Sequence, residues 1–86
     1  ESYRYTYSEI LFRLPEKQKE LLIAITKEGK ATEITSGSFV KKYKLHSPSS
    51  VQAALKGLLE KDFVTRERDV YQVYDRFLAI WLKENY

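Results

Sequence analysis

The chain has 86 residues and a formal net charge of +3, with 43% hydrophobic and 31% charged side chains. This length predicts one small domain, and this balance excludes an intrinsically disordered chain. The absence of cysteine excludes disulfides and cysteine-ligated metal or redox sites. No apolar run approaches the roughly 20 residues of a membrane-spanning helix, so we expect no membrane contact. The chain begins at Glu1 and contains no methionine, so we expect it to be a domain of a longer protein.

The first 14 residues carry aromatic and apolar side chains at helical spacing, namely Tyr3, Tyr7, Ile10, Leu11 and Leu14. This period predicts a helix from Tyr5 to Arg13. Tyr3, Tyr5 and Tyr7 also alternate, which leaves a strand open at the start of the chain. We expect residues 1–14 to form a leading helix or linker that connects to a preceding domain.

A second helix is predicted to begin at Pro15, because proline suits the first position of a helix. Gly29 is a natural stop for this helix. Its buried stripe is predicted to contain three apolar residues, Leu21, Leu22 and Ile25. Residues 31–34 then form a connector, which leaves open one strand of a small sheet.

A short third helix is predicted over Gly37–Tyr43, because Thr35 or Ser36 can cap its first backbone N–H groups. This helix is expected to bury Phe39, Val40 and Tyr43. Residues 44–46 form the following turn, in which Leu45 points inward.

A fourth helix is predicted over Pro48–Lys61. Ser47 can cap its start, and proline is favoured at the first helical position. Its apolar residues recur at helical spacing, as Val51, Ala54, Leu55, Leu58 and Leu59. One face of this helix is therefore expected to be buried and the opposite face to be exposed.

Two strand-like runs follow, Phe63–Thr65 and Val70–Val73, separated by the charged tip Arg66–Asp69. They predict a β-hairpin. Asp62 lies where a helix commonly ends in a left-handed residue, which aspartate adopts less readily than glycine. The tip contains no glycine, so its turn type stays open.

The last helix is predicted from Tyr74 or Asp75 to Glu84. Its expected apolar face contains Tyr74, Phe77, Leu78, Trp81 and Leu82. The first helix is its natural partner, which would bring the two ends of the chain together. The aromatic side chains are expected to lie in the core or in a seam between domains, and base stacking is the alternative.

A helix, a short helix, a turn, a longer helix and a hairpin form the pattern of a winged helix-turn-helix. The predicted fold class is therefore mainly α with a small β-hairpin wing. We expect a single domain over residues 1–86, with the winged helix at 15–73 and a flanking C-terminal helix at 74–86.

Residues that could support catalysis are few, so we expect no enzyme. His46 is the only histidine and has no carboxylate pair beside it, which excludes a metal cluster. We expect it to be a turn residue, and a phosphate contact is the alternative. The sequence contains neither GxxxxGK[ST] nor GxGxxG, so no nucleotide or other cofactor is expected in this chain.

Positive charge is concentrated in the middle of the chain. Residues 36–68 carry seven basic and three acidic side chains, an excess of four. This segment covers the predicted helix-turn-helix and wing, where a nucleic-acid surface would need positive charge. A solvated lysine face explains the same excess equally well.

Nine residues are the candidate nucleic-acid contacts: Lys41, Lys42, Lys44, Ser49, Ser50, Gln52, Lys56, Arg66 and Arg68. Ser49, Gln52, Ala53 and Lys56 share one face near the start of the fourth helix. Gln52 could read adenine, Lys56 could reach guanine or phosphate, and the serines could bind phosphate. The wing arginines could reach the DNA backbone or a minor groove.

Several segments carry a family resemblance over about residues 15–84: KQKELLIAITKEG, SGSFVKKYKL, SPSSVQAALKGLLEKDFVTRE and VYQVYDRFLAIWL. They resemble the C-terminal winged-helix domain of a P-loop ATPase family (AAA+/STAND-like), first grouped from archaea and also widespread in bacteria. The most distinctive part is the step Tyr71-x-Val73-x-Asp75 into an aromatic helix that ends near Trp81. Asp62 and the glycine-free wing tip depart from the usual glycine-bearing turns of that family.

The resemblance implies a cytoplasmic protein whose preceding ATPase core uses ATP and magnesium, with no nucleotide-binding residue in this chain. It also implies a winged helix that binds double-stranded DNA or regulates the ATPase. We therefore expect a non-catalytic DNA-binding module. The alternative is a regulatory or protein-interaction domain that packs on the parent's ATPase core without contacting DNA. The sequence indicates no oligomeric state.

Overall fold

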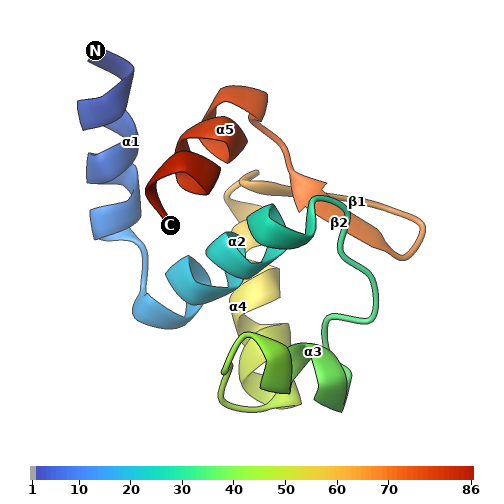
Figure 1. The fold of residues 1–86 in the computed structure, drawn as a ribbon. Coiled ribbons are helices and arrows are strands. Elements are labelled where there is room, and N and C mark those ends of the chain that lie inside the picture. The colour runs from blue at the N-terminus through green and yellow to red at the C-terminus, as the bar shows by residue number, and fades with distance from the viewer. Residues whose placement is uncertain (1) are drawn as a thin grey trace.

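The computed structural model describes the backbone of residues 2–86 and the side chains of residues 7–86. Its elements in chain order are α1 (Ser2–Arg13), α2 (Glu16–Glu28), α3 (Gly37–Lys42), α4 (Pro48–Glu60), β1 (Val64–Glu67), β2 (Val70–Val73) and α5 (Arg76–Asn85). In Figure 1, α2 lies in the middle, with α1 to its left, α5 above it, α3 below it, α4 behind it and the hairpin to its right. This arrangement confirms the predicted fold, which is mainly helical with an antiparallel hairpin.

The core is built around α2, which contacts α4, α5 and β2. Its side chains Leu21, Leu22 and Ile25 are fully buried, as the sequence predicts. Side chains with at most 2% exposure also come from the other helices, from the connector before α3 and from β1: Leu11, Leu58, Leu78, Leu82, Ile34 and Val64. Burial of such apolar area is the main favourable term in folding, so these contacts fix how each helix is rotated about its own axis.

The predicted helix caps are confirmed. The Ser36 hydroxyl accepts a hydrogen bond from the Phe39 N–H at 3.3 Å, and the Ser47 hydroxyl accepts one from the Ser50 N–H at 3.2 Å. Ser36 rather than Thr35 therefore caps α3. Gly29 ends α2 with a φ of 80°, a backbone conformation that glycine adopts without strain. The third and fourth helices each end one residue before the predicted boundary.

The hairpin pairs Val64 with Val73 and Glu67 with Val70 in an antiparallel register. The predicted first strand, Phe63–Thr65, is wrong at both ends: β1 begins one residue later, at Val64, and continues two residues further, because Arg66 and Glu67 also pair with β2. The tip is therefore limited to residues 68 and 69. A short two-stranded wing need not bury its strands, so charged side chains do not mark where a strand stops.

Two residues other than glycine, one just before the hairpin and one at its tip, have a left-handed backbone conformation. Asp62, between α4 and β1, has a φ of 63°, as its position predicts, and Arg68 at the tip has a φ of 59°.

On the other edge of β2, Ala31 and Tyr71 exchange two backbone hydrogen bonds of 2.8 Å. The connector before α3 thus adds a single bridge to the sheet, and β2 lies between this bridge and β1.

The last helix begins at Arg76, one residue after the later of its two predicted starts, and it ends at Asn85, one residue after the predicted end. The Asp75 carboxylate accepts hydrogen bonds from the N–H groups of Phe77 and Leu78 at 2.9 and 3.3 Å, so it is the N-cap. Leu78 and Leu82 are buried as predicted, but Tyr74 and Phe77 are each 69% exposed, so their assignment to the core is wrong. Tyr74 precedes the cap, and Phe77 lies about 100° around the helix from Leu78.

The predicted contact between the first and last helices is confirmed, because the rings of Tyr7 and Trp81 lie 5.9 Å apart. The first helix begins at Ser2, which excludes the strand alternative. The expected positions of the Tyr3 and Tyr5 side chains lie outside the described residues. None of the helices described here has the length and apolar character needed to cross a membrane.

Candidate nucleic-acid interface

The outer face of α4 is the centre of the candidate interface. Val51, Ala54, Leu55 and Leu58 are buried on the inner face of α4. On the opposite face Ser49, Gln52, Ala53 and Lys56 are exposed, as the helical period predicts. The Gln52 and Lys56 side chains form no hydrogen bond or ion pair with any other described residue.

The two candidate serines lie on different sides of α4. Ser49 is exposed, and its hydroxyl lies 3.3 Å from that of Ser47. Ser50 is half-buried and accepts a hydrogen bond from the Ser47 hydroxyl at 3.2 Å. It lines a groove between α4 and the start of α2, together with Pro15 and Gln18. The structure therefore groups Ser49, but not Ser50, with Gln52 and Lys56.

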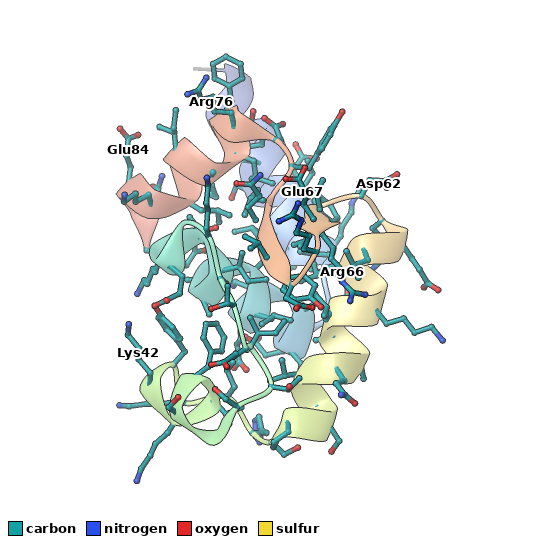
Figure 2. All side chains as sticks on the ribbon, turned by 90° about the vertical axis from the view of Figure 1, so that its right-hand side faces the viewer. Lys42, Asp62, Arg66, Glu67, Arg76 and Glu84 are labelled. Atoms are coloured by element: carbon teal, nitrogen blue, oxygen red, sulfur yellow. The ribbon has the colours of Figure 1, made fainter. Side chains whose placement is uncertain are left out.

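The lysines after Phe39 differ in what they contact. Lys41 and Lys44 are exposed, and their side chains have no partner among the described residues. Lys42 instead forms an ion pair with Glu28 at the end of α2, with 2.7 Å between Nζ and Oε2. The Tyr43 hydroxyl donates to the same carboxylate oxygen. Figure 2 shows Lys42 on the side of α3 that is remote from α4.

This cluster of Glu28, Lys42 and Tyr43 shifts all three pKa values. Hydrogen bonds from Lys42 and then Tyr43 hold the pKa of Glu28 below its usual range. The hydrogen bond to Glu28 raises the pKa of Lys42, and desolvation followed by the same carboxylate raises the pKa of Tyr43. The Lys42 ammonium therefore already has a partner, Glu28, in an ion pair at the surface. The sequence does not predict this contact, because Glu28 lies 14 residues before Lys42 and belongs to a different helix.

Replacing Lys42 by methionine is expected to raise the pKa of Glu28 toward its ordinary value, because the hydrogen bond that lowers this pKa most is lost. An NMR titration of the Glu28 carboxyl carbon measures this shift. Since the folded pKa is lowered, the contribution of Glu28 to stability is present at neutral pH and is lost as the pH falls through the folded pKa. Lys41→Met is the matched control and should leave the titration unchanged. An identical Glu28 pKa in Lys42→Met and the wild type would contradict the assignment.

The two wing arginines also differ. The Arg66 Nε donates to the Arg68 carbonyl at 2.8 Å, and its guanidinium lies 3.7 Å from Asp69 and over the Tyr71 ring. Arg68 is exposed at the tip, and its side chain has no partner among the described residues. Figure 2 shows Arg66 and Glu67 together on the hairpin. Only Arg68 is thus free to contact a ligand without first breaking an interaction.

A cleft of about 320 Å³ separates α4 from the wing. Gln52 and Leu55 line it from α4, and Asp69 and Tyr71 line it from the wing. Glu33 borders it from the connector before α3. Both carboxylates disfavour a phosphate inside this cleft. Glu33 and Asp69 lie just outside the basic segment 36–68, so the charge count of that segment does not include them.

His46 is exposed in the turn before α4, where the sequence places it. Among residues 2–86, no three histidine, aspartate or glutamate side chains gather closely enough to hold a metal ion.

Comparison with known proteins gives the family. The family model described as "Probable winged helix domain" matches residues 5–84, which is nearly the whole chain. The chain belongs to this winged helix family. No curated protein and no solved structure matched it. In this winged helix domain, α3 and α4 form the helix-turn-helix pair, α4 occupies the recognition position, and β1 and β2 form the wing.

Proposed function

We propose that this winged helix domain binds duplex DNA with the outer face of α4. The observation that carries the proposal is that Gln52 and Lys56 lie one turn apart on this face, both exposed. A side chain of each type at this spacing can contact a base edge and a phosphate at the same time. Neither side chain has a partner among the described residues, so neither has to break an interaction with them before it contacts DNA.

The remaining candidates fall into two groups in this proposal. Lys41, Lys44 and Arg68 are free and would hold the phosphate backbone on either side of α4. Lys42 and Arg66 would contribute only after leaving Glu28 or the wing. The proposed interface therefore depends on few cations, and we expect it to bind DNA more weakly than a strongly basic domain.

Titration of the domain with fluorescent duplex DNA at several salt concentrations tests this function. Binding should weaken as salt rises. The logarithm of the association constant plotted against the logarithm of the salt concentration should have a slope of about −3 to −4 if Lys56, Lys41, Lys44 and Arg68 each replace about one counterion. A single-stranded oligonucleotide of the same length serves as the comparison and should bind less tightly. If duplex DNA is not bound even at about 20 mM salt, the proposal fails.

We also propose, from the family resemblance, that the domain belongs to a cytoplasmic P-loop ATPase whose ATP and magnesium are bound outside this chain. In that setting a second function is contact with the ATPase core. Phe12 supports it, because its ring is 88% exposed on α1, the helix expected to follow a preceding domain. Phenylalanine is one of the residue types that are enriched at protein interfaces.

Phe12→Ser in the longer protein tests this second function. We expect ATP turnover to change, because the domain would no longer pack on the core, while Lys56→Ala should leave turnover unaltered. Circular dichroism of the variant domain verifies that the fold is intact. Equal turnover of Phe12→Ser and the wild type would exclude a regulatory contact through α1.

A further inference from the structure

The outer side of α5 is an exposed stripe with apolar residues between charges. Phe77 is 69% exposed and Ile80 is 49% exposed, while Leu78 and Leu82 on the opposite side are buried. Arg76, Lys83 and Glu84 are also exposed on this outer side. Figure 2 shows Arg76 and Glu84 at opposite ends of α5, pointing away from the rest of the molecule. No hydrogen bond or ion pair joins the Arg76 or Glu84 side chain to another described residue.

The charges of this stripe are arranged symmetrically about Ile80. Arg76 lies four residues before it and Glu84 four residues after it. Eight residues of helix separate the two charges by about 12 Å, so they cannot pair within one chain. In an antiparallel arrangement of two such helices, however, Arg76 of each copy comes level with Glu84 of the other. The stripe is therefore complementary to itself.

The apolar residues follow the same symmetry. Phe77 precedes Ile80 by three residues and Lys83 follows it by three, so antiparallel pairing brings each ring level with a lysine of the second copy. Lysine stems cover apolar surface well, and their ammonium groups are attracted to aromatic faces. The two Ile80 side chains meet at the centre. Apolar contact thus lies in the middle and ion pairs lie at both ends, as in a small protein interface.

We propose that a second copy of this chain covers the stripe, so that two domains associate through antiparallel α5 helices centred on Ile80. The residues Arg76, Ile80 and Glu84 form one i, i+4, i+8 ridge, and such ridges of two helices interlock in the commonest class of helix packing. The contact is isologous, since each surface meets its own copy. This symmetry about Ile80 is what pairing with a second copy requires, whereas pairing with an unrelated partner does not require it.

The dimer leaves the proposed DNA-binding face open. In Figure 1, α5 lies above α2, whereas α3 lies below α2 and α4 lies behind it; only the wing adjoins the start of α5, through β2. Two α4 helices could then face two half-sites of one duplex. The association itself stands on α5 alone and does not require DNA.

Sedimentation equilibrium of the whole chain tests the proposal. We expect a reversible monomer–dimer equilibrium between about 10 µM and about 1 mM, because two ten-residue helices bury little area. Arg76→Glu and Glu84→Arg should each weaken the dimer about tenfold, since each turns two attractions into two repulsions. The double variant Arg76→Glu/Glu84→Arg should restore the affinity of the wild type. Ile80→Asp should abolish association.

The charge reversals cannot act by unfolding α5. Glutamate at its first turn and arginine at its last turn both interact favourably with the helix dipole. Glu60→Arg, an equivalent reversal at the end of α4, is the matched control and should not change association. A wild-type chain that stays monomeric at about 1 mM overturns the proposal. So does a dimer that survives Ile80→Asp, or a double variant that remains as weak as the single ones.

Discussion

Replacing Leu58 by alanine is expected to lower the free energy of unfolding by about 3 kcal/mol. The Leu58 side chain is fully buried on the inner face of α4, where this helix packs against α2. Removing its methyl groups leaves a cavity that the surrounding leucines cannot fill without moving from well-packed positions. The melting temperature should fall by about 15 °C for a domain of this size. Thermal and urea unfolding followed by circular dichroism measure both quantities.

Leu59→Ala is the matched control, because it removes the same atoms one position further along the same helix. Leu59 is only half-buried, so its replacement should cost about 1 kcal/mol or less. The difference between the two variants reports how α4 is rotated about its axis. Equal losses would mean that α4 does not bury the Leu58 face, and the outer face with Gln52 and Lys56 would then be assigned incorrectly.

The fold could be predicted from the sequence wherever a local rule sets the structure. Ser36 and Ser47 act as caps because their hydroxyls reach N–H groups three residues ahead, which depends on the chain alone. The rotation of α4 could be predicted because its apolar residues repeat with the helical period. The family comparison confirms the winged helix that these elements imply. The outer face of α4 follows directly from that rotation.

The features that the sequence could not predict depend on contacts between distant residues. The ion pair that removes Lys42 from the free cations joins α3 to α2. Leu78 meets the core while its neighbour Phe77 is exposed, although the aromatic spacing by itself suggests a wider buried face. In α5, periodicity indicates which residues share a face, but it does not indicate how far around the helix the buried face extends. Because Lys42 and Arg66 already have partners, the candidate interface contains fewer free cations in the structure than the sequence suggests.

Replacing Lys56 by alanine is expected to weaken the binding of duplex DNA about tenfold at about 0.1 M salt. Lys56 is the one cation among the exposed residues Ser49, Gln52, Ala53 and Lys56 of α4, and its ammonium has no partner among the residues whose side chains the structure describes. Losing one phosphate contact retains about one counterion on the DNA, so the log–log salt slope should become about one unit shallower. Alanine is a strong helix former, so α4 itself should not be destabilised. Fluorescence anisotropy at several salt concentrations measures the affinity and the slope together.

Two further variants separate this phosphate contact from other effects. Lys27→Ala removes the same charge from an exposed position at the end of α2, and it should leave the affinity and the slope nearly unchanged. Gln52→Ala should leave the salt slope unaltered, because it removes no charge, but it should reduce discrimination between duplexes that differ at one adenine by about 1–3 kcal/mol. If Lys27→Ala and Lys56→Ala weaken binding equally, the attraction is due to net charge alone. The outer face of α4 would then have no specific role, and an interface formed by Gln52 and Lys56 would be excluded.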